Sequence, residues 1–205
     1  MHSQLRRDER GLTLVEVLVA IVILGIIIVP LGNAVISFVR STDDTTRRLN
    51  ESHDAQIMVA YFAQDVQSVG VRDWGGDGFP LKQSIFRDVE YNSLLYPCGA
   101  SDTPKAVVRL VWDGPGTSGP VRVSYVVKTA RGERQLHRIK CVGSSTVDSD
   151  IVLAHNVDGV PELVCSTDCS AAPAVPQSVT LTVIIKASGG QQPLTVTLKG
   201  QRRQT

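Results

Sequence analysis

The sequence lacks the common signatures of an enzyme or of a nucleic-acid-binding protein. It contains no G-x-S-x-G elbow, no P-loop and no H-E-x-x-H motif, and its four histidines (His2, His53, His137 and His155) are scattered. Aromatic residues make up only 5% of the chain and do not alternate with a basic stripe, and the net charge is +1. We therefore expect no catalysis, no cofactor and no nucleic-acid partner.

Charged side chains are also absent from Val17–Leu31, which is apolar throughout. Between residues 12 and 39, only Thr13, Glu16, Asn33 and Ser37 are clearly polar. As a helix this segment would be about 40 Å long, which is enough to cross a hydrocarbon core of about 30 Å. Three arginines precede it, at positions 6, 7 and 10, and basic residues hold the adjoining end of a membrane helix in the cytoplasm. This pattern predicts a single-pass membrane protein with its remainder outside the cytoplasm.

Two simpler interpretations compete for this segment. One is a plain membrane anchor, and the other is a cleaved secretory signal, because Gly32-Asn33-Ala34 resembles a small-x-small cleavage site. Neither needs Glu16, whose carboxylate costs about 2–3 kcal/mol if it lies unpaired in the membrane. If the chain were cut after Gly11, the new amino group of Leu12 would lie one helical turn before Glu16, on the same face.

The segment Arg10-Gly11-Leu12-Thr13-Leu14-Val15-Glu16, followed by a long apolar helix, resembles the cleavage and methylation motif of type IV prepilins. The resemblance implies that a prepilin peptidase cuts after Gly11 and methylates the new terminus at Leu12. It also implies that Glu16 guides assembly with other pilin subunits on an inner-membrane platform. Leu12 departs from the usual Phe but keeps the site apolar.

A second helical half is expected after the membrane segment. Ile57, Met58, Tyr61, Phe62, Val66 and Val69 recur at helical spacing and form one apolar stripe that suits packing on a sheet. Gly70 is a natural stop, so one nearly continuous helix is predicted over 12–69. Pro30 interrupts the apolar run and predicts either a harmless kink or a flexible point.

From residue 106 onward the chain is rich in short strand patterns. They lie at 106–112, 121–127, 135–141, 151–157, 179–186 and 194–199, and the last two flank the hairpin candidate SGGQQ. We expect an antiparallel sheet with one face on the helix, and hence an α+β fold. The predicted parts are a leader (1–11), a transmembrane half of the stem (12–39), an amphipathic half (40–69) and a β-rich head (70–205).

Four cysteines, Cys98, Cys141, Cys165 and Cys169, all follow the membrane segment, which favours two disulfides in an oxidising compartment. Three pairings are possible, and we favour Cys98–Cys141 with Cys165–Cys169. The alternative is a zinc site built from His137, Cys141, Cys165 and Cys169. Asp73 and Asp77 flank a Gly-rich turn, where a solvated turn is favoured over a calcium site.

The layout narrows the resemblance to the J-type minor pseudopilins and minor pilins, because a stem ending in AQDVQSVG precedes a strand-rich head with a late hairpin and a basic tail. The first hypothesis is a structural subunit of a type IV pilus or type II secretion filament, held in the inner membrane before assembly. A second is a tip module of the same filament that binds a substrate, a surface or DNA through loops at 70–105 or 142–178. A third is a secreted or anchored protein with an ordinary signal.

Overall fold

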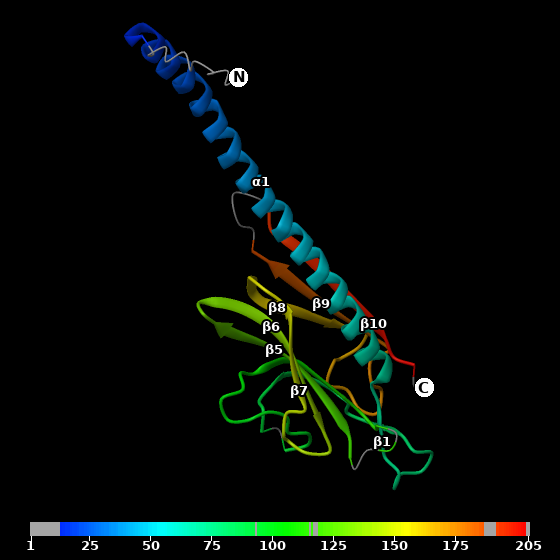
Figure 1. The fold of residues 1–205 in the computed structure, drawn as a ribbon. Helices are drawn as coiled ribbons and strands as arrows, with labels where there is room; N and C mark the ends of the chain where they lie inside the picture. Colours follow the sequence, from blue (N-terminus) through cyan, green and yellow to red (C-terminus); the bar gives the residue numbers. More distant parts are fainter. Residues whose placement is uncertain (1–12, 93, 115, 117–118, 187–191, 204–205) are drawn as a thin grey trace, which may run out of the picture. The chain divides into compact units, whose positions relative to one another are not determined.

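The computed structural model describes residues 13–92, 94–114, 116, 119–186 and 192–203 (Figure 1). The chain divides into two compact units, Met1–Arg48 and Leu49–Thr205. One helix, α1 (Leu14–Ser68), contributes to both units, and all the strands belong to the second.

Helix α1 forms because its first part is rich in Leu, Ile and Val without a strand-like polar alternation, while its later part is rich in Ala and Gln. It continues through Pro30 and ends at Ser68, shortly before Gly70, whose φ of 145° suits glycine. The hydroxyls of Thr42, Thr45 and Thr46 donate to carbonyls four residues earlier. These bounds agree with the helix predicted over 12–69, apart from Leu12, which lies outside the described residues.

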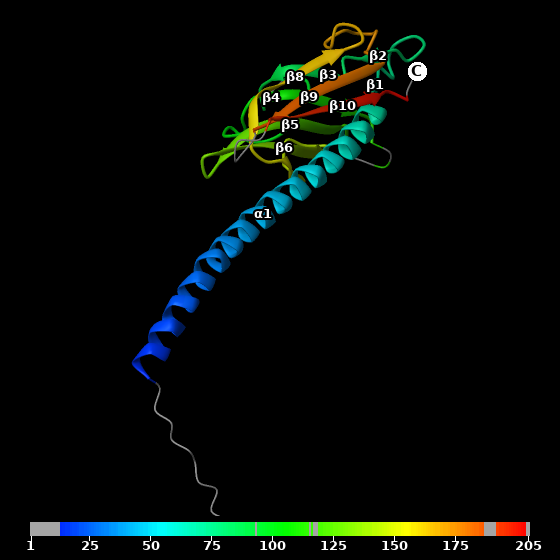
Figure 2. The ribbon, with the colours of Figure 1, turned by 90° about the horizontal axis from the view of Figure 1, so that it is seen from above.

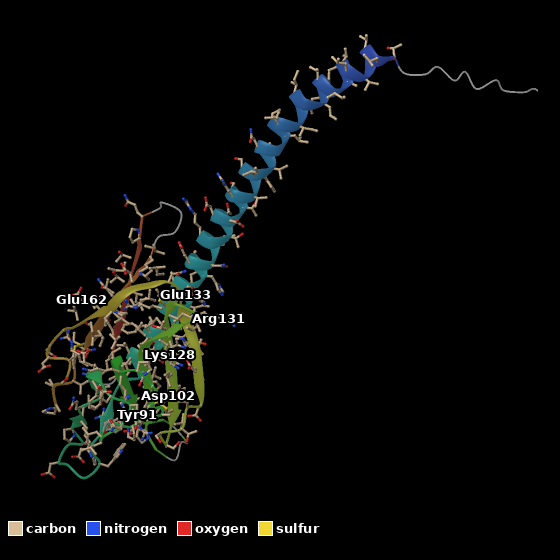
Figure 3. The ribbon with its side chains drawn as sticks, turned by 90° about the vertical axis from the view of Figure 1, so that its left-hand side faces the viewer. Tyr91, Asp102, Lys128, Arg131, Glu133 and Glu162 are labelled. Carbon is tan, nitrogen blue, oxygen red and sulfur yellow. A yellow bond between two sulfur atoms is a disulfide. The ribbon has the colours of Figure 1, made fainter. Side chains whose placement is uncertain are left out.

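The larger sheet is a five-stranded antiparallel meander with the order β3-β4-β5-β6-β7. Its strands are β3 (Ile85–Val89), β4 (Ala106–Trp112), β5 (Val121–Ala130), β6 (Glu133–Val142) and β7 (Ser149–Ala154). Arg131 and Gly132 connect β5 to β6 with φ values of 54° and 80°, as a tight two-residue hairpin requires. Figure 3 shows Arg131 and Glu133 at this turn, with Lys128 further along β5.

Three more strands form the second sheet, with the order β10-β9-β8 (Figure 2). They are β8 (Val157–Cys165), β9 (Ser178–Ile185) and β10 (Leu194–Gln201). The pairing of β9 with β10 confirms the late hairpin. A small ribbon of β1 (Val71–Arg72) and β2 (Leu81–Lys82) follows the helix, and a parallel bridge joins Gly70 to Trp112.

Two features of the predicted head need correction. The strand predicted over 151–157 is two strands, because β7 ends at Ala154 and β8 begins at Val157. Asn156, between them, has a φ of 53°, a left-handed conformation that breaks an extended strand. The strands also divide between two larger sheets and a two-stranded ribbon, rather than forming one sheet, although their ladders are antiparallel as predicted.

The main core of the second unit lies between the end of α1 and both larger sheets. Met58, Phe62, Val66 and Val69 are fully buried in it, and Ile57 and Tyr61 are partly buried. Burial of each such side chain contributes about 1.5–3 kcal/mol. The apolar stripe predicted from the sequence is therefore the face of the helix that packs on the head.

Candidate assembly site

The described chain begins with a reciprocal cap at the start of α1. The Thr13 N–H donates to Glu16 Oε2 at 3.4 Å, and the Glu16 N–H donates to Thr13 Oγ1 at 3.3 Å. This is a capping box, in which each residue's side-chain oxygen accepts a hydrogen bond from the other residue's N–H; the Glu16 N–H also donates to the Thr13 carbonyl at 3.1 Å. The Glu16 carboxylate therefore turns back toward the N-terminal end of the helix, one residue from Leu12.

The surface that follows Glu16 is apolar and uncovered. All large apolar side chains from Leu14 to Val39 are exposed. Among the described residues, α1 is the one helix that is long and apolar enough to cross a membrane. A surface of this size is stable only against lipid or against other apolar helices. It therefore fits a membrane-anchored stem.

The processing residues predicted from the sequence lie just before this cap. Gly11 and Leu12 are outside the described residues, so cleavage after Gly11 and methylation of Leu12 stay predictions. Glu16 is described, and the structure gives its contacts to Thr13, but its role in assembly also stays a prediction.

Both disulfides favoured from the sequence are present in the structure. Cys98–Cys141 joins a loop to β6 across 43 residues, and Cys165–Cys169 closes a short loop at the end of β8. The four sulfurs are thus not available as zinc ligands, and His137 contacts Asp150 instead. No group of three metal-binding side chains converges in the part of the chain that the structure describes.

Asp73 belongs to a structured turn rather than to a ligand cluster. Its Oδ1 accepts a hydrogen bond from the Gly75 N–H and contacts Lys82 Nζ at 3.2 Å. The bond from Lys82 is the main cause that lowers the pKa of Asp73. The contacts therefore agree with the solvated turn that we favoured over a calcium site.

Sequence reasoning missed a buried polar network that fixes the end of α1 on the larger sheet. Asp65, on the helix, accepts hydrogen bonds from Arg138 Nε and Nη2 at 2.7 and 2.6 Å, and from the Tyr125 hydroxyl at 2.6 Å. All three residues are buried. Arg138 also stacks over Tyr61, 4.8 Å from the ring centre, and Phe62 meets Tyr125 edge-on. The signal that could have indicated this network is a carboxylate between Phe62 and Val66, within the apolar stripe.

The electrostatics of this network agree with a permanent ion pair. Burial alone would lower the pKa of Arg138, but the hydrogen bonds and charge of Asp65 raise it above its ordinary value. Burial, and then the charge of Asp65, raise the pKa of Tyr125. The arginine thus stays charged and the phenol stays protonated at physiological pH. The network therefore holds the helix on the sheet and does not transfer protons.

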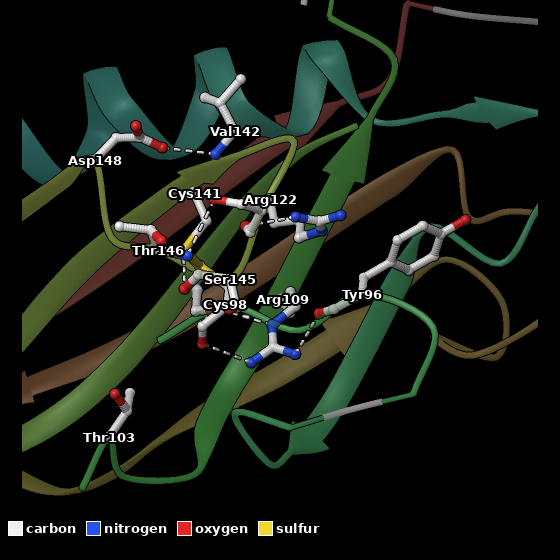
Figure 4. Close-up of a disulfide and its surroundings, with 12 residues drawn as sticks. Tyr96, Cys98, Thr103, Arg109, Arg122, Cys141, Val142, Ser145, Thr146 and Asp148 are labelled. Carbon is white, nitrogen blue, oxygen red and sulfur yellow. Dashed lines mark hydrogen bonds between the residues drawn. A yellow bond between two sulfur atoms is a disulfide. The ribbon is translucent and has the colours of Figure 1, made fainter. Parts of the chain in front are cut away.

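A second buried polar group lies on the opposite face of the same sheet, next to the Cys98–Cys141 disulfide (Figure 4). Arg109 donates from Nε to Ser124 Oγ at 2.8 Å and from Nη1 to the Tyr96 carbonyl at 2.7 Å. Burial, and then the like charge of Arg122, lower the pKa of Arg109 to about 10. Arg109 therefore holds the loop before β4 on the sheet through carbonyl groups.

His137 and His155, which lie in the strand-rich part of the head, each contact a carboxylate. His137 Nδ1 lies 2.7 Å from Asp150 Oδ1, and Lys128 Nζ lies 2.6 Å from Asp150 Oδ2. His155 Nδ1 lies 2.9 Å from Asp54 Oδ2 on α1. The contacts that the structure gives to these histidines are explained by packing between elements, which agrees with the structural reading of the sequence.

Comparison with known proteins supports the N-terminal interpretation. No curated protein and no solved structure matches the chain significantly. Residues 6–32 match the family model of the prokaryotic N-terminal methylation motif. The match includes Gly11, Glu16 and most of the apolar segment. It implies assembly with other pilin subunits and processing by their peptidase, and it supports a type IV pilin-like protein whose role is structural.

Proposed function

We propose that this chain is a minor pilin or pseudopilin subunit of a type IV pilus or type II secretion filament. The observation that carries the proposal is the methylation motif over residues 6–32, which runs into an uncovered apolar helix. The chain would be inserted with its basic leader in the cytoplasm, cut after Gly11 and methylated at Leu12. It would then leave the membrane by packing its stem against the stems of neighbouring subunits.

The physical case for helix packing rests on the apolar side chains from Leu14 to Val39. In the membrane they contact lipid, and in a filament they would contact equivalent helices, so the apolar surface stays out of water in both states. Glu16 is the one carboxylate in that stretch. Its position beside Thr13 would place it near the amino group that cleavage creates at Leu12, in the same chain or in a neighbour.

A filament subunit must also keep its head attached while its stem is moved. The network of Asp65, Tyr125 and Arg138 supports this requirement, because it adds directional hydrogen bonds to the apolar contacts of Phe62 and Val66. Cys98–Cys141 further ties a surface loop to β6. The disulfide suits a head outside the cytoplasm.

The test is the mature N-terminus of the protein expressed in a host that has a prepilin peptidase. We expect mass spectrometry to find a chain that begins at methylated Leu12, and a Gly11→Leu variant to stay uncut. A chain that begins at Val35 would instead identify a secretory signal, and an intact Met1 would identify a plain anchor. Either result would overturn the proposal.

A further inference from the structure

A cavity of about 490 Å³ lies between three loops of the head unit. Its walls are mostly apolar and come from the end of the β1–β2 connection, the loop before β4 and the loop before β9. They include Pro80, Leu81, Leu95, Tyr96, Ala172 and Pro173. Pockets that bind small molecules or peptide side chains have volumes of about 300–1,000 Å³ and similar walls. The cavity is thus large enough to accept bulky side chains of a partner.

The rim of this cavity adds further uncovered apolar surface. Trp74 and Phe79 are both exposed, and their rings lie 5.6 Å apart on the loop that leads to Pro80. Leu95, which lines the cavity, is exposed on the neighbouring loop. Adjacent exposed aromatic and aliphatic side chains around a recess are typical of a surface that binds a partner.

Two buried arginines, Arg109 and Arg122, lie next to the wall of the cavity that Tyr96 forms. Arg109 holds the Tyr96 carbonyl, and Arg122 lies on the next strand, with its side chain pointing toward Tyr96 (Figure 4). Arg122 donates from Nη1 to the Ser144 carbonyl at 2.7 Å, but its buried Nε has no hydrogen-bond partner. Neither guanidinium forms an ion pair with a carboxylate of the described residues.

This charge acts on the cavity wall itself. Burial raises the pKa of Tyr96, and the charges of Lys82, Asp113 and Arg122 act on its hydroxyl, so these groups lie close together. Lys82 also lines the cavity, where its ion pair with Asp73 is half exposed to water. Among the charges that act on the Tyr96 hydroxyl, Lys82 has the largest effect and Arg122 adds to it, whereas Asp113 opposes them. Asp73 also lines the cavity, but Lys82 pairs with it, and the buried guanidinium of Arg122 has no carboxylate partner among the described residues. The positive charge of Arg122 is therefore left to attract a negatively charged group to this wall.

We propose that this cavity is a docking site for a partner protein segment in which a bulky apolar side chain neighbours a carboxylate. The apolar side chain would fill the space between the proline and leucine walls. The carboxylate would lie toward Tyr96, where Lys82 and the buried Arg122 attract it. A flat lipid surface would reach the rim residues but would leave the recess unfilled, which favours a peptide over a membrane. The inference does not depend on the filament role.

The test uses the full chain in detergent micelles and an array of short capped peptides in matched pairs. Within each pair an apolar residue neighbours either Glu or Gln. We expect fluorescence anisotropy to show binding of acidic members, with the Gln partners weaker by about threefold to tenfold. Raising the salt concentration should reduce this difference.

Substitutions at and near the cavity wall then show where the acidic peptides bind. Leu95→Glu places a like charge in the wall and should weaken binding of the acidic peptides by about tenfold or more. Leu94→Glu is the matched control, because Leu94 is fully exposed and does not line the cavity, so binding should stay within about twofold. Lys82→Gln removes a positive charge from the wall. Because Lys82 is half exposed and water screens its charge, binding should weaken by only about threefold.

Any of the following results would overturn the proposal. One is the absence of binding by any peptide of the array. Another is equal binding of the Glu and Gln members, or equal effects of the substitutions at Leu94 and Leu95. The third is quenching of Trp74 fluorescence by brominated lipid, in a Trp112→Phe background of the full chain in vesicles, which would identify a lipid-facing surface.

Discussion

Asp65 has an unusual position for a carboxylate, inside the apolar face of a helix. An ionised carboxylate in such a place is strongly destabilising unless it is paired and fully hydrogen bonded. Its bonds to Arg138 and Tyr125 meet this condition from two adjacent strands, β6 and β5. Only one rotation and one axial position of the helix bring these groups together. We infer that the network fixes the register of the helix end on the sheet.

Replacing Asp65 tests this role. Asp65→Ala would leave Arg138 buried without its partner, so we expect a loss of about 3–5 kcal/mol in the free energy of unfolding. Tyr125→Phe removes one hydrogen bond and should cost about 1–2 kcal/mol. The measurement is urea unfolding of the full chain in micelles, followed by tryptophan fluorescence.

The matched control is Asp54→Ala, because Asp54 is on the same helix and pairs with His155 at the surface. His155 is half exposed and Asp54 is partly buried, so water screens this pair more than the buried network, and we expect a contribution of about 1 kcal/mol. Similar losses for Asp54→Ala and Asp65→Ala would show that the buried network has no special importance for the head.

Asp150 gives the head a pH-dependent contribution to stability. Burial would raise the pKa of Asp150, but hydrogen bonds from Lys128 and His137 outweigh burial and lower it. With a lowered folded-state pKa, the contribution is complete above the unfolded pKa of about 4 and is lost as the pH falls through the folded pKa. Asp150→Asn should therefore destabilise the head near neutral pH, by less than about 1 kcal/mol because the group is a third exposed.

The effect should shrink as the pH falls below the unfolded pKa of about 4 and through the lowered folded-state pKa, because Asp150 then becomes protonated and loses its charge. Unfolding midpoints at several pH values measure it. Asp88→Asn is the control, because Asp88 contacts Arg87 in an exposed pair and should give a small difference at every pH. A constant difference for Asp150→Asn across the pH range would contradict the assignment.

Local patterns in the sequence single out individual residues, although the assembly role of Glu16 stays a prediction. Glu16 was identified from its spacing to Gly11 and from its place at the start of an apolar run. The disulfides were predicted from the even number of cysteines and from their position after the membrane segment. Asp65, Arg109 and Arg122 were not found, since their partners are 13 to 73 residues away in the chain. Such contacts depend on the strand register, which no local pattern specifies.

Among the elements, the helix and the six strands with apolar patterns were predictable, whereas β1, β2 and β3, which lie in a region read as loop, and the longer strand β8 were not. Its sequence, VDGVPELVC, contains Gly159 and Pro161, which both weaken a strand assignment. The structure accommodates them at the edge of the three-stranded sheet, where the register shifts between Asp158 and Glu162. A bulge at a sheet edge removes the ladder bond that proline cannot make, so tertiary context overrides the local signal.

Strand β10 approaches α1 so closely that glycine is required at one position. A Cβ atom on Gly200 would lie 2.4 Å from Val66 Cβ, which is shorter than any normal contact. Figures 1 and 2 show the last turns of α1 beside β10. Gly200→Ala should therefore separate strand and helix and destabilise the head by about 1–3 kcal/mol.

A compensating change distinguishes crowding from other causes. Val66→Ala should lose about 1–3 kcal/mol alone, but it makes room for the new methyl group, so the double variant should be more stable than the sum predicts. Gly75→Ala is the control, because its nearest contact is an ordinary 3.7 Å. Additive losses in urea unfolding would show that Gly200 and Val66 do not compete for the same space.

At the scale of the whole molecule, the two units keep their apolar side chains in opposite environments. Those of the first unit are exposed along the helix, whereas Met58, Phe62 and the inner strand residues are buried in the head. The exposed set needs lipid or other helices, and the buried set does not. A substitution near residue 16 should thus affect membrane residence and assembly while the head keeps its fold.

Glu16 combines a helix cap with a negative charge, and three variants separate the two properties. Glu16→Gln keeps a residue that can complete the capping box but removes the charge. Thr13→Ala keeps the charge but removes the hydroxyl that caps the Glu16 N–H, at a cost of about 1 kcal/mol to the first turn. Glu16→Ala removes both.

If the carboxylate pairs with the amino terminus of Leu12, only one axial offset between neighbouring helices brings the charges together. We then expect Glu16→Gln and Glu16→Ala to be processed normally and to enter filaments poorly, while Thr13→Ala enters them almost as well as wild type. The measurement is the amount of each variant in sheared filaments from a strain without redundant minor subunits, relative to processed protein in the membrane. Normal incorporation of Glu16→Gln with poor incorporation of Thr13→Ala would show instead that the cap, and not the charge, is what assembly requires.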